Sequence, residues 1–199
     1  MVTFLINSFF NKLFFILITL TNPAINVKIK VWGYRIFAIV IFSCSIEKKL
    51  VSRYDNTVKY LFKLPDEEYL ECVVMDYKYG LTICVSTQVG CKMGCSFCAS
   101  GIGGFKRHLA PSEILGQIYA AQRDLQVRIS RIVLMGMGEP LDNYDNVVKF
   151  LKLVSDENGL NIGMRHISLS TSGIVPRIYD LLDLDLQLTL SVSLHAPNN

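Results

Sequence analysis

Between residues 81 and 194, short apolar runs typical of β-strands alternate with segments of helical periodicity. The predicted strands are residues 81–86, 131–135, 166–170 and 186–194. Three helices are predicted. One begins at Pro111, and the other two cover residues 143–155 and 174–182. Strands that alternate with helices in this way form parallel sheets with helical crossovers. The sequence therefore predicts an α/β fold built on a parallel sheet.

Polar and glycine-rich clusters follow each of these predicted strands. They are residues 88–104, 136–140, 170–173 and 193–195. The first lies within residues 87–108, which show no clear period and predict one long loop. The carboxyl ends of parallel strands meet at one edge of the sheet, and ligands bind at that edge. We therefore expect the four clusters to lie together and to form the functional site.

A smaller β segment precedes this region. Two strand-like runs, 57–64 and 69–76, are separated by Pro65-Asp66-Glu67-Glu68, which is a turn signal. This arrangement predicts a small antiparallel segment before the parallel sheet.

Residues 1–45 differ in composition from the rest of the chain. They contain four basic and no acidic residues, whereas residues 46–199 carry the other 16 basic and all 17 acidic residues. Such a contrast indicates two parts of different role, and residues 1–45 have no recognisable domain. A nearly neutral main part gives no electrostatic indication of nucleic-acid binding.

Two apolar runs in this first part are candidates for membrane segments. Phe4–Thr21 is broken by polar residues and Val31–Cys44 is short, so neither reaches the roughly 20 apolar residues of a membrane span. No small-residue cleavage site follows the apolar stretch after Lys12, as a signal peptide would require. We expect no membrane association, with an anchor or signal as the alternative.

Three of the six cysteines lie within eight residues, in Cys91-Lys-Met-Gly-Cys95-Ser-Phe-Cys98. Thiolates suit iron–sulfur clusters, whereas a closed zinc site needs four ligands. Three ligands on a four-iron cluster leave one iron open for chemistry, so we predict a [4Fe–4S] cluster. Cys84 and His108 keep a zinc site open as an alternative. Clustered cysteines also indicate a reducing cytoplasm.

This spacing, with an aromatic residue before the last cysteine, resembles the radical S-adenosylmethionine superfamily. Five segments in order resemble more closely its dual-specificity 23S rRNA and tRNA adenine-C2 methyltransferases, the RlmN family. They are Val85-Ser-Thr-Gln-Val-Gly-Cys91, Phe97-Cys-Ala-Ser100, Gly136-Met-Gly-Glu-Pro-Leu141, Leu169-Ser-Thr-Ser-Gly173 and Ser193-Leu-His-Ala-Pro-Asn198. The resemblance covers about residues 46–199. It implies an incomplete radical SAM core, a partial (βα)6-type barrel truncated after about four βα strands.

The resemblance also implies roles for individual residues. Cys91, Cys95 and Cys98 would hold the cluster. The residues that would contact S-adenosylmethionine are Gly138, Glu139, Ser170, Ser193, Leu194 and His195, with Glu139 near its amino group. Glu71 would accept the proton from adenine C2, and Cys84 would resolve a protein–RNA crosslink.

Each of these residues also has a simpler interpretation. Glu139 fits a plain turn after a strand, and Ser170 fits a helix-capping loop. Glu71 fits an exposed strand carboxylate, Cys84 a small buried strand residue, and His195 a structural histidine.

The implied reaction methylates C2 of adenosine in 23S rRNA and tRNA and uses two S-adenosylmethionine molecules. The first methylates a cysteine in a C-terminal loop, and the second, cleaved by the cluster, starts the radical step. The resemblance further implies an electron donor such as flavodoxin or ferredoxin and a monomeric enzyme. All six cysteines lie at or before residue 98, so no candidate for the methyl carrier is found. We therefore expect the chain to be an incomplete copy that is inactive alone.

Three alternatives stay open. The first is the sister methyltransferase that modifies adenine C8 and confers antibiotic resistance. The second is a radical enzyme with another substrate, and the third is a zinc-binding interaction module.

Overall fold

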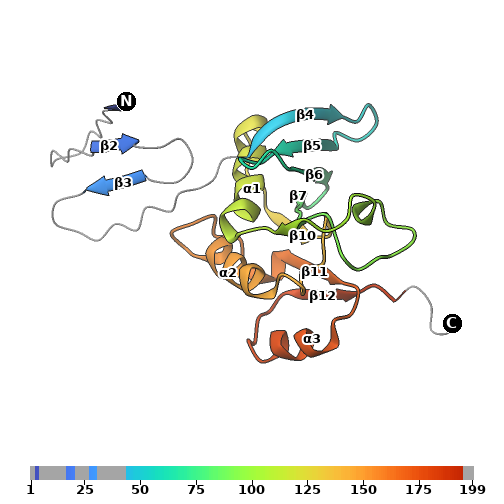
Figure 1. Cartoon of the computed structure of the whole chain (residues 1–199). Coiled ribbons are helices and arrows are strands. Elements are labelled where there is room, and N and C mark those ends of the chain that lie inside the picture. The colour runs from blue at the N-terminus through green and yellow to red at the C-terminus, as the bar shows by residue number, and fades with distance from the viewer. Residues whose placement is uncertain (1–2, 5–16, 21–26, 31–43, 195–199) are drawn as a thin grey trace. The chain divides into compact units, whose positions relative to one another are not determined.

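The computed structural model describes residues 3–4, 17–20, 27–30 and 44–194 (Figure 1). The chain divides into two compact units, Met1–Val40 and Ile41–Asn199. The first contains an antiparallel sheet in the order β1-β2-β3. Its strands are β1 (Thr3–Phe4), β2 (Leu17–Leu20) and β3 (Val27–Lys30).

The apolar runs predicted near the N-terminus lie mostly outside the described residues. Within the described part of the chain, no helix is long and apolar enough to span a membrane.

A seven-stranded sheet is the centre of the second unit, in the order β12-β11-β10-β7-β6-β5-β4. The strands are β4 (Ser45–Val51), β5 (Val58–Lys63), β6 (Tyr69–Tyr77), β7 (Gly80–Cys84), β10 (Arg131–Leu134), β11 (Ile167–Thr171) and β12 (Thr189–Val192). Strands β7, β10, β11 and β12 are parallel, and β4 to β7 are antiparallel. The predicted α/β fold with a parallel sheet is confirmed, and the antiparallel segment is continuous with that sheet.

Three helices accompany the parallel strands, namely α1 (Pro111–Leu125), α2 (Tyr144–Ser155) and α3 (Val175–Leu182) (Figure 1). Ile114 and Ile118 of α1 are one helical turn apart and fully buried, as are Val147 and Leu151 of α2. They share one core with the buried strand residues Ile83, Ile132 and Leu169. Burial of each such side chain contributes about 1.5–3 kcal/mol, so this core fixes the helices on the sheet.

The other face of the sheet carries half-exposed side chains. Val73 of β6, Cys84 of β7 and Val133 of β10 are direct neighbours across the strands and therefore share this face. Glu71 lies two residues before Val73, so it points to the same side. Glu71 and Cys84 are thus brought to one face, near the carboxyl end of β7.

The segment 87–108 is more ordered than the sequence predicts. Its two ends pair as β8 (Gln88–Val89) and β9 (Arg107–His108), and η1 (Ala99–Gly101) lies between them. At the base, Gly90 has φ +71°, and a Cβ there would lie 1.8 Å from the carbonyl oxygen of Gly104. The prediction of one irregular loop was wrong at its ends, because two-residue strands leave no alternating pattern. We call residues 91–104 the cysteine loop.

Candidate cofactor site

A cavity of about 230 Å³ lies at the carboxyl edge of the parallel strands. Its lining residues come from the cysteine loop and from the ends of β10, β11 and β12. They are Cys91, Met93, Cys95, Phe97, Cys98, Leu134, Met135, Gly136, Gly138, Glu139, Ser170, Thr171, Ser172 and Ser193. The structure thereby brings together seven residues that the sequence predicts for the site. These are Cys91, Cys95, Cys98, Gly138, Glu139, Ser170 and Ser193.

All three cysteines of the loop are free thiols; Cys91 and Cys95 are half-buried and Cys98 is exposed. Burial raises the pKa of the Cys91 thiol, and the nearby Cys98, Cys95 and Glu139 raise it further, against a hydrogen bond from the Met93 backbone that lowers it. The surroundings therefore disfavour a thiolate at Cys91 unless a positive group, such as iron, is bound beside it.

Glu139 is 4% exposed, although it lies in a loop between β10 and α2. Its Oε1 accepts hydrogen bonds from Thr171 Oγ1 at 2.7 Å and from the Leu141 amide at 3.0 Å. Its Oε2 accepts one from the Ser172 amide at 2.8 Å. All three donors are neutral, and within the described residues Glu139 has no ion pair. A buried carboxylate of this kind favours a cationic ligand such as an ammonium group.

Two glycines let the segment after β10 approach the end of β7. A Cβ at Gly136 would lie 2.7 Å from the carbonyl oxygen of Val85 and 2.8 Å from the amide nitrogen of Ser86. At Gly138, φ is +99° and a Cβ would lie 2.5 Å from the Cβ of Gln88. Larger residues would push Glu139 away from the cavity wall.

The predicted cofactor contacts at the ends of β11 and β12 are partly described. Ser170 Oγ and Ser193 Oγ lie 3.4 Å apart, and the Ser193 amide donates to the Thr171 carbonyl at 2.9 Å. Leu194 is 77% exposed and is not among the lining residues. His195 lies outside the described residues, so its contact stays a prediction.

Glu71 and Cys84 do not line the cavity. The Glu71 side chain is 49% exposed and forms an ion pair with Lys59 at 2.8 Å. Cys84 is half-buried; burial raises the pKa of its thiol, and a hydrogen bond from the Met135 backbone lowers it. The structure places Glu71 and Cys84 on one face of the sheet. Their chemical roles stay predictions.

Sequence reasoning missed the residues that hold Glu139 in place. Thr171 and Ser172 lie inside a segment singled out for Ser170, but spacing does not tell which hydroxyl or amide turns towards another strand. Gln88 likewise lies inside the segment Val85–Cys91. Its side-chain oxygen Oε1 accepts a hydrogen bond from the Glu139 backbone amide at 2.8 Å.

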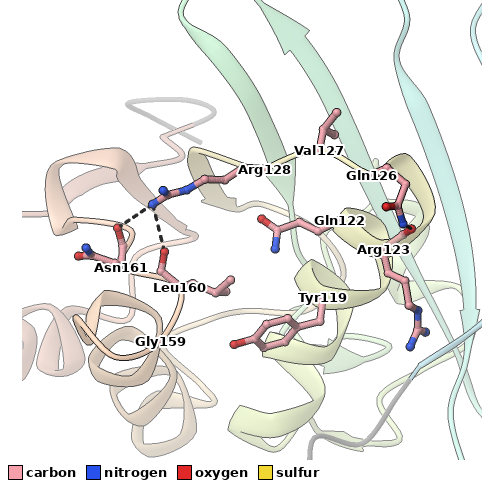
Figure 2. Close-up of a pocket in the computed structure, with 9 residues that line it drawn as sticks. All are labelled: Tyr119, Gln122, Arg123, Gln126, Val127, Arg128, Gly159, Leu160 and Asn161. Carbon is pink, nitrogen blue, oxygen red and sulfur yellow. Dashed lines mark hydrogen bonds between the residues drawn. The ribbon is translucent and has the colours of Figure 1, made fainter. Parts of the chain in front are cut away.

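A larger cavity of about 600 Å³ lies elsewhere, between the second half of α1 and the loop around Gly159–Asn161 (Figure 2). Arg128 reaches across it and donates to the carbonyl oxygens of Leu160 at 3.3 Å and Asn161 at 3.4 Å. Its described lining includes no cysteine and no carboxylate side chain. Size alone therefore does not make it the candidate site.

The donor set of the smaller cavity fits an iron–sulfur cluster beside a cationic ligand. Three soft thiols suit iron, and a buried carboxylate suits an ammonium group. Among the described residues, no group of three or more His, Cys, Asp or Glu converges as ligands of a single metal ion. The three thiols line the cavity together instead.

The chain is similar in sequence to known proteins. Over 155 residues the chain is 62% identical to the probable dual-specificity RNA methyltransferase RlmN of Clostridium acetobutylicum, covering 78% of this chain and 45% of that protein. It is 61% identical to the corresponding protein of Clostridium tetani, covering 78% and 44%. The chain thus spans less than half the length of these relatives.

A solved structure is also similar to this chain. The crystal structure of a radical SAM methyltransferase from Sphaerobacter thermophilus aligns with a TM-score of 0.74 and 41% identity, over 78% of this chain and 47% of that one. The profile of the Radical SAM superfamily matches residues 85–199, which is more than half of the chain. The chain therefore belongs to the radical SAM superfamily, and this membership implies a [4Fe–4S] cluster and S-adenosylmethionine as cofactors.

Proposed function

We propose that this chain is the cofactor-binding part of an RlmN-type methyltransferase that acts on C2 of adenosine in 23S rRNA and tRNA. The observation that carries the proposal is the single cavity that joins three loop thiols to the buried Glu139. Identity of about 60% to proteins named as RlmN RNA methyltransferases supports an RNA substrate. The RNA reaction is proposed for a whole protein of this type, since the chain spans less than half of those relatives.

Within this proposal, Cys91, Cys95 and Cys98 hold the cluster. When bound, the cluster supplies the electron that cleaves S-adenosylmethionine. Glu139 would accept a hydrogen bond from the amino group of that cofactor. The Thr171 hydroxyl, which donates to Glu139 Oε1 at 2.7 Å, would hold the carboxylate in position at the cavity.

The remaining cofactor contacts come from the ends of the last two strands. Gly138 lines the cavity with no side chain to fill it, and Ser170 and Ser193 offer hydroxyl groups at the cavity wall. Leu194 and His195 complete this set by resemblance to the family.

Glu71 and Cys84 would serve the RNA half of the reaction. Glu71 takes the proton from adenine C2, which requires the carboxylate to leave Lys59, its partner at 2.8 Å. Cys84 lies on the same sheet face. Its thiolate would attack the sulfur of the methyl-carrying cysteine, so that a disulfide forms as the carbon–sulfur bond to the RNA breaks. We also propose a flavodoxin or ferredoxin as electron donor, a monomeric state and a cytoplasmic location.

The first experiment tests the cluster. The chain is purified without oxygen, reconstituted with iron and sulfide, and assayed for iron content and for absorbance at roughly 400 nm. S-adenosylmethionine and dithionite, as the electron source, are then added, and the release of 5′-deoxyadenosine is measured. We expect about four iron atoms per chain. Cys95→Ser should abolish both the absorbance and the cleavage, whereas Cys44→Ala, a buried cysteine outside the loop, should keep both. A colourless protein that binds one zinc ion would replace this proposal with a zinc-binding module.

The second experiment tests the RNA reaction. A chimera is made in which the matching segment of this chain replaces that of the Clostridium acetobutylicum relative, so the remaining length is supplied. We expect 2-methyladenosine in digested 23S rRNA and tRNA by mass spectrometry. The appearance of 8-methyladenosine would instead support the C8 alternative, and no methylated adenosine would reject both.

A further inference from the structure

Gln88 connects two parts of the cofactor cavity. It is fully buried on β8, just before the cysteine loop. Its Oε1 accepts the hydrogen bond of the Glu139 amide at 2.8 Å, and its Nε2 donates to Asp142 Oδ2 at 2.7 Å. The same Nε2 lies 3.0 Å from His108 Nδ1. The Gln88 side chain is therefore hydrogen-bonded to both Glu139 and Asp142.

Asp142 makes the second connection, from the Glu139 segment back to the cysteine loop. Its Oδ1 forms an ion pair with Lys92 at 2.8 Å, and Lys92 directly follows Cys91. The Lys92 Nζ also lies 5.2 Å from the ring centre of Phe105, just after the loop. Asp142 thus holds the start of the loop while its other oxygen holds Gln88.

Packing makes these contacts specific. At Gly138 a Cβ would come within 2.5 Å of the Gln88 Cβ and 2.7 Å of its Cγ, so the side chain lies directly against that backbone. The base of the loop is closed by the tight approach of Gly90 and Gly104. Movement of the loop base would therefore be passed to the Glu139 segment through Gln88.

We propose that Gln88 and Asp142 are positioning residues that lock the cysteine loop to the segment 136–142, so that a ligand held by the loop meets Glu139 at a fixed place. Neither residue lines the cavity itself. The identity of that ligand rests on the proposed function. The lock is a property of the chain without cofactors and is tested separately.

The test uses a pair of isosteric variants. Gln88→Glu keeps an acceptor for the Glu139 amide but puts a carboxylate oxygen beside Asp142 in place of the donor. The matched control is Gln187→Glu, an exposed residue that accepts a hydrogen bond from Arg165 Nε at 2.9 Å, which a carboxylate also accepts.

Hydrogen–deuterium exchange of the cofactor-free chain measures directly how well the backbone amides of the two connected segments are protected. In Gln88→Glu we expect exchange to rise roughly tenfold or more in both the cysteine loop and residues 136–142. The control should match the original chain in both segments. A rise in only one segment, or in neither, would overturn the proposal.

A compensating variant separates positioning from general destabilisation. In the double variant Gln88→Glu with Asp142→Asn, the donor and the acceptor exchange places, so the hydrogen bond can form again. We expect most of the lost protection to return in both segments, because the asparagine amide at position 142 can donate to the new carboxylate while its oxygen still accepts a hydrogen bond from Lys92. If protection stays lost, Gln88 has only a structural role.

A second readout uses the chain loaded with its cluster. Gln88→Glu should keep its iron content but raise the KM for S-adenosylmethionine roughly tenfold, with a smaller change in kcat. An unchanged KM with normal iron would contradict the inference. If the original chain itself takes up no iron, the proposed function fails, and the exchange experiment still decides the lock.

Discussion

Replacement of Thr171 by valine tests the central contact of the site. Thr171 is 2% exposed, and its hydroxyl donates to Glu139 Oε1 at 2.7 Å and accepts from the Gly173 amide at 3.1 Å. Valine has nearly the same shape, so Thr171→Val removes these two hydrogen bonds with little change in packing.

The expected loss follows from the two bonds. A hydrogen bond to a charged group contributes about 1.5–3 kcal/mol and a neutral one about 0.5–1.5 kcal/mol. Glu139 keeps its bonds from the amides of Leu141 and Ser172, which limits the loss. We therefore expect the free energy of unfolding to fall by about 2–3 kcal/mol, or roughly 4–12 °C in Tm for a unit of this size.

The measurement is urea unfolding of the cofactor-free chain followed by far-ultraviolet circular dichroism. Thr171→Ser is the control, because it keeps the hydroxyl and loses one methyl group, at a cost of about 1 kcal/mol. If the valine variant is as stable as the serine variant, the hydroxyl does not hold Glu139 and the reasoning is refuted.

Three further predictions concern other parts of the second unit. Gly136→Ala should lower the free energy of unfolding by about 2 kcal/mol or more, because its Cβ meets backbone atoms at 2.7 Å, whereas Gly101→Ala, with no atom within 4 Å, should be nearly neutral in the same urea assay. In the native chain at about pH 8, iodoacetamide should modify the exposed Cys98 well before the buried Cys44, whose pKa burial raises to about 11; equal rates in peptide mass spectrometry would contradict this. The hydrogen bond from Arg107 lowers the pKa of Asp66 in the folded chain despite partial burial. The stabilisation from this ion pair is therefore complete above the ordinary pKa of an aspartate and is lost as the pH falls through the lowered pKa. In Asp66→Asn, the acid decline in stability should be slightly shallower below about pH 4, and parallel curves would count against the ion pair.

The strands were predictable where one face is buried. In β5 and β6 the buried and exposed positions alternate, and that alternation is written in the sequence. β4 was missed because all seven of its residues are exposed, so its apolar and charged positions carry no period. An edge strand is held by backbone hydrogen bonds to its neighbour, and these leave little trace in side-chain pattern.

The gathering of the site residues was predictable from topology. Parallel strands end at one edge, so the residues after β10, β11 and β12 had to lie near each other. The hydrogen bonds within the site were not predictable in this way. That Gln88 bonds both Glu139 and Asp142 depends on its rotamer and on the absence of a side chain at Gly138, neither of which the spacing of motifs reveals.

The charge of the cavity explains why its occupants should be positive. The ionisable groups in its described lining are the thiols of Cys91, Cys95 and Cys98 and the carboxylate of Glu139, and each becomes negative when ionised. Burial raises the pKa of Cys91, and repulsion from the other three groups raises it further. Iron ions and an ammonium group both relieve this repulsion, so binding of either favours the other. Cluster assembly must then release protons from the thiols, and it should become easier as the pH rises.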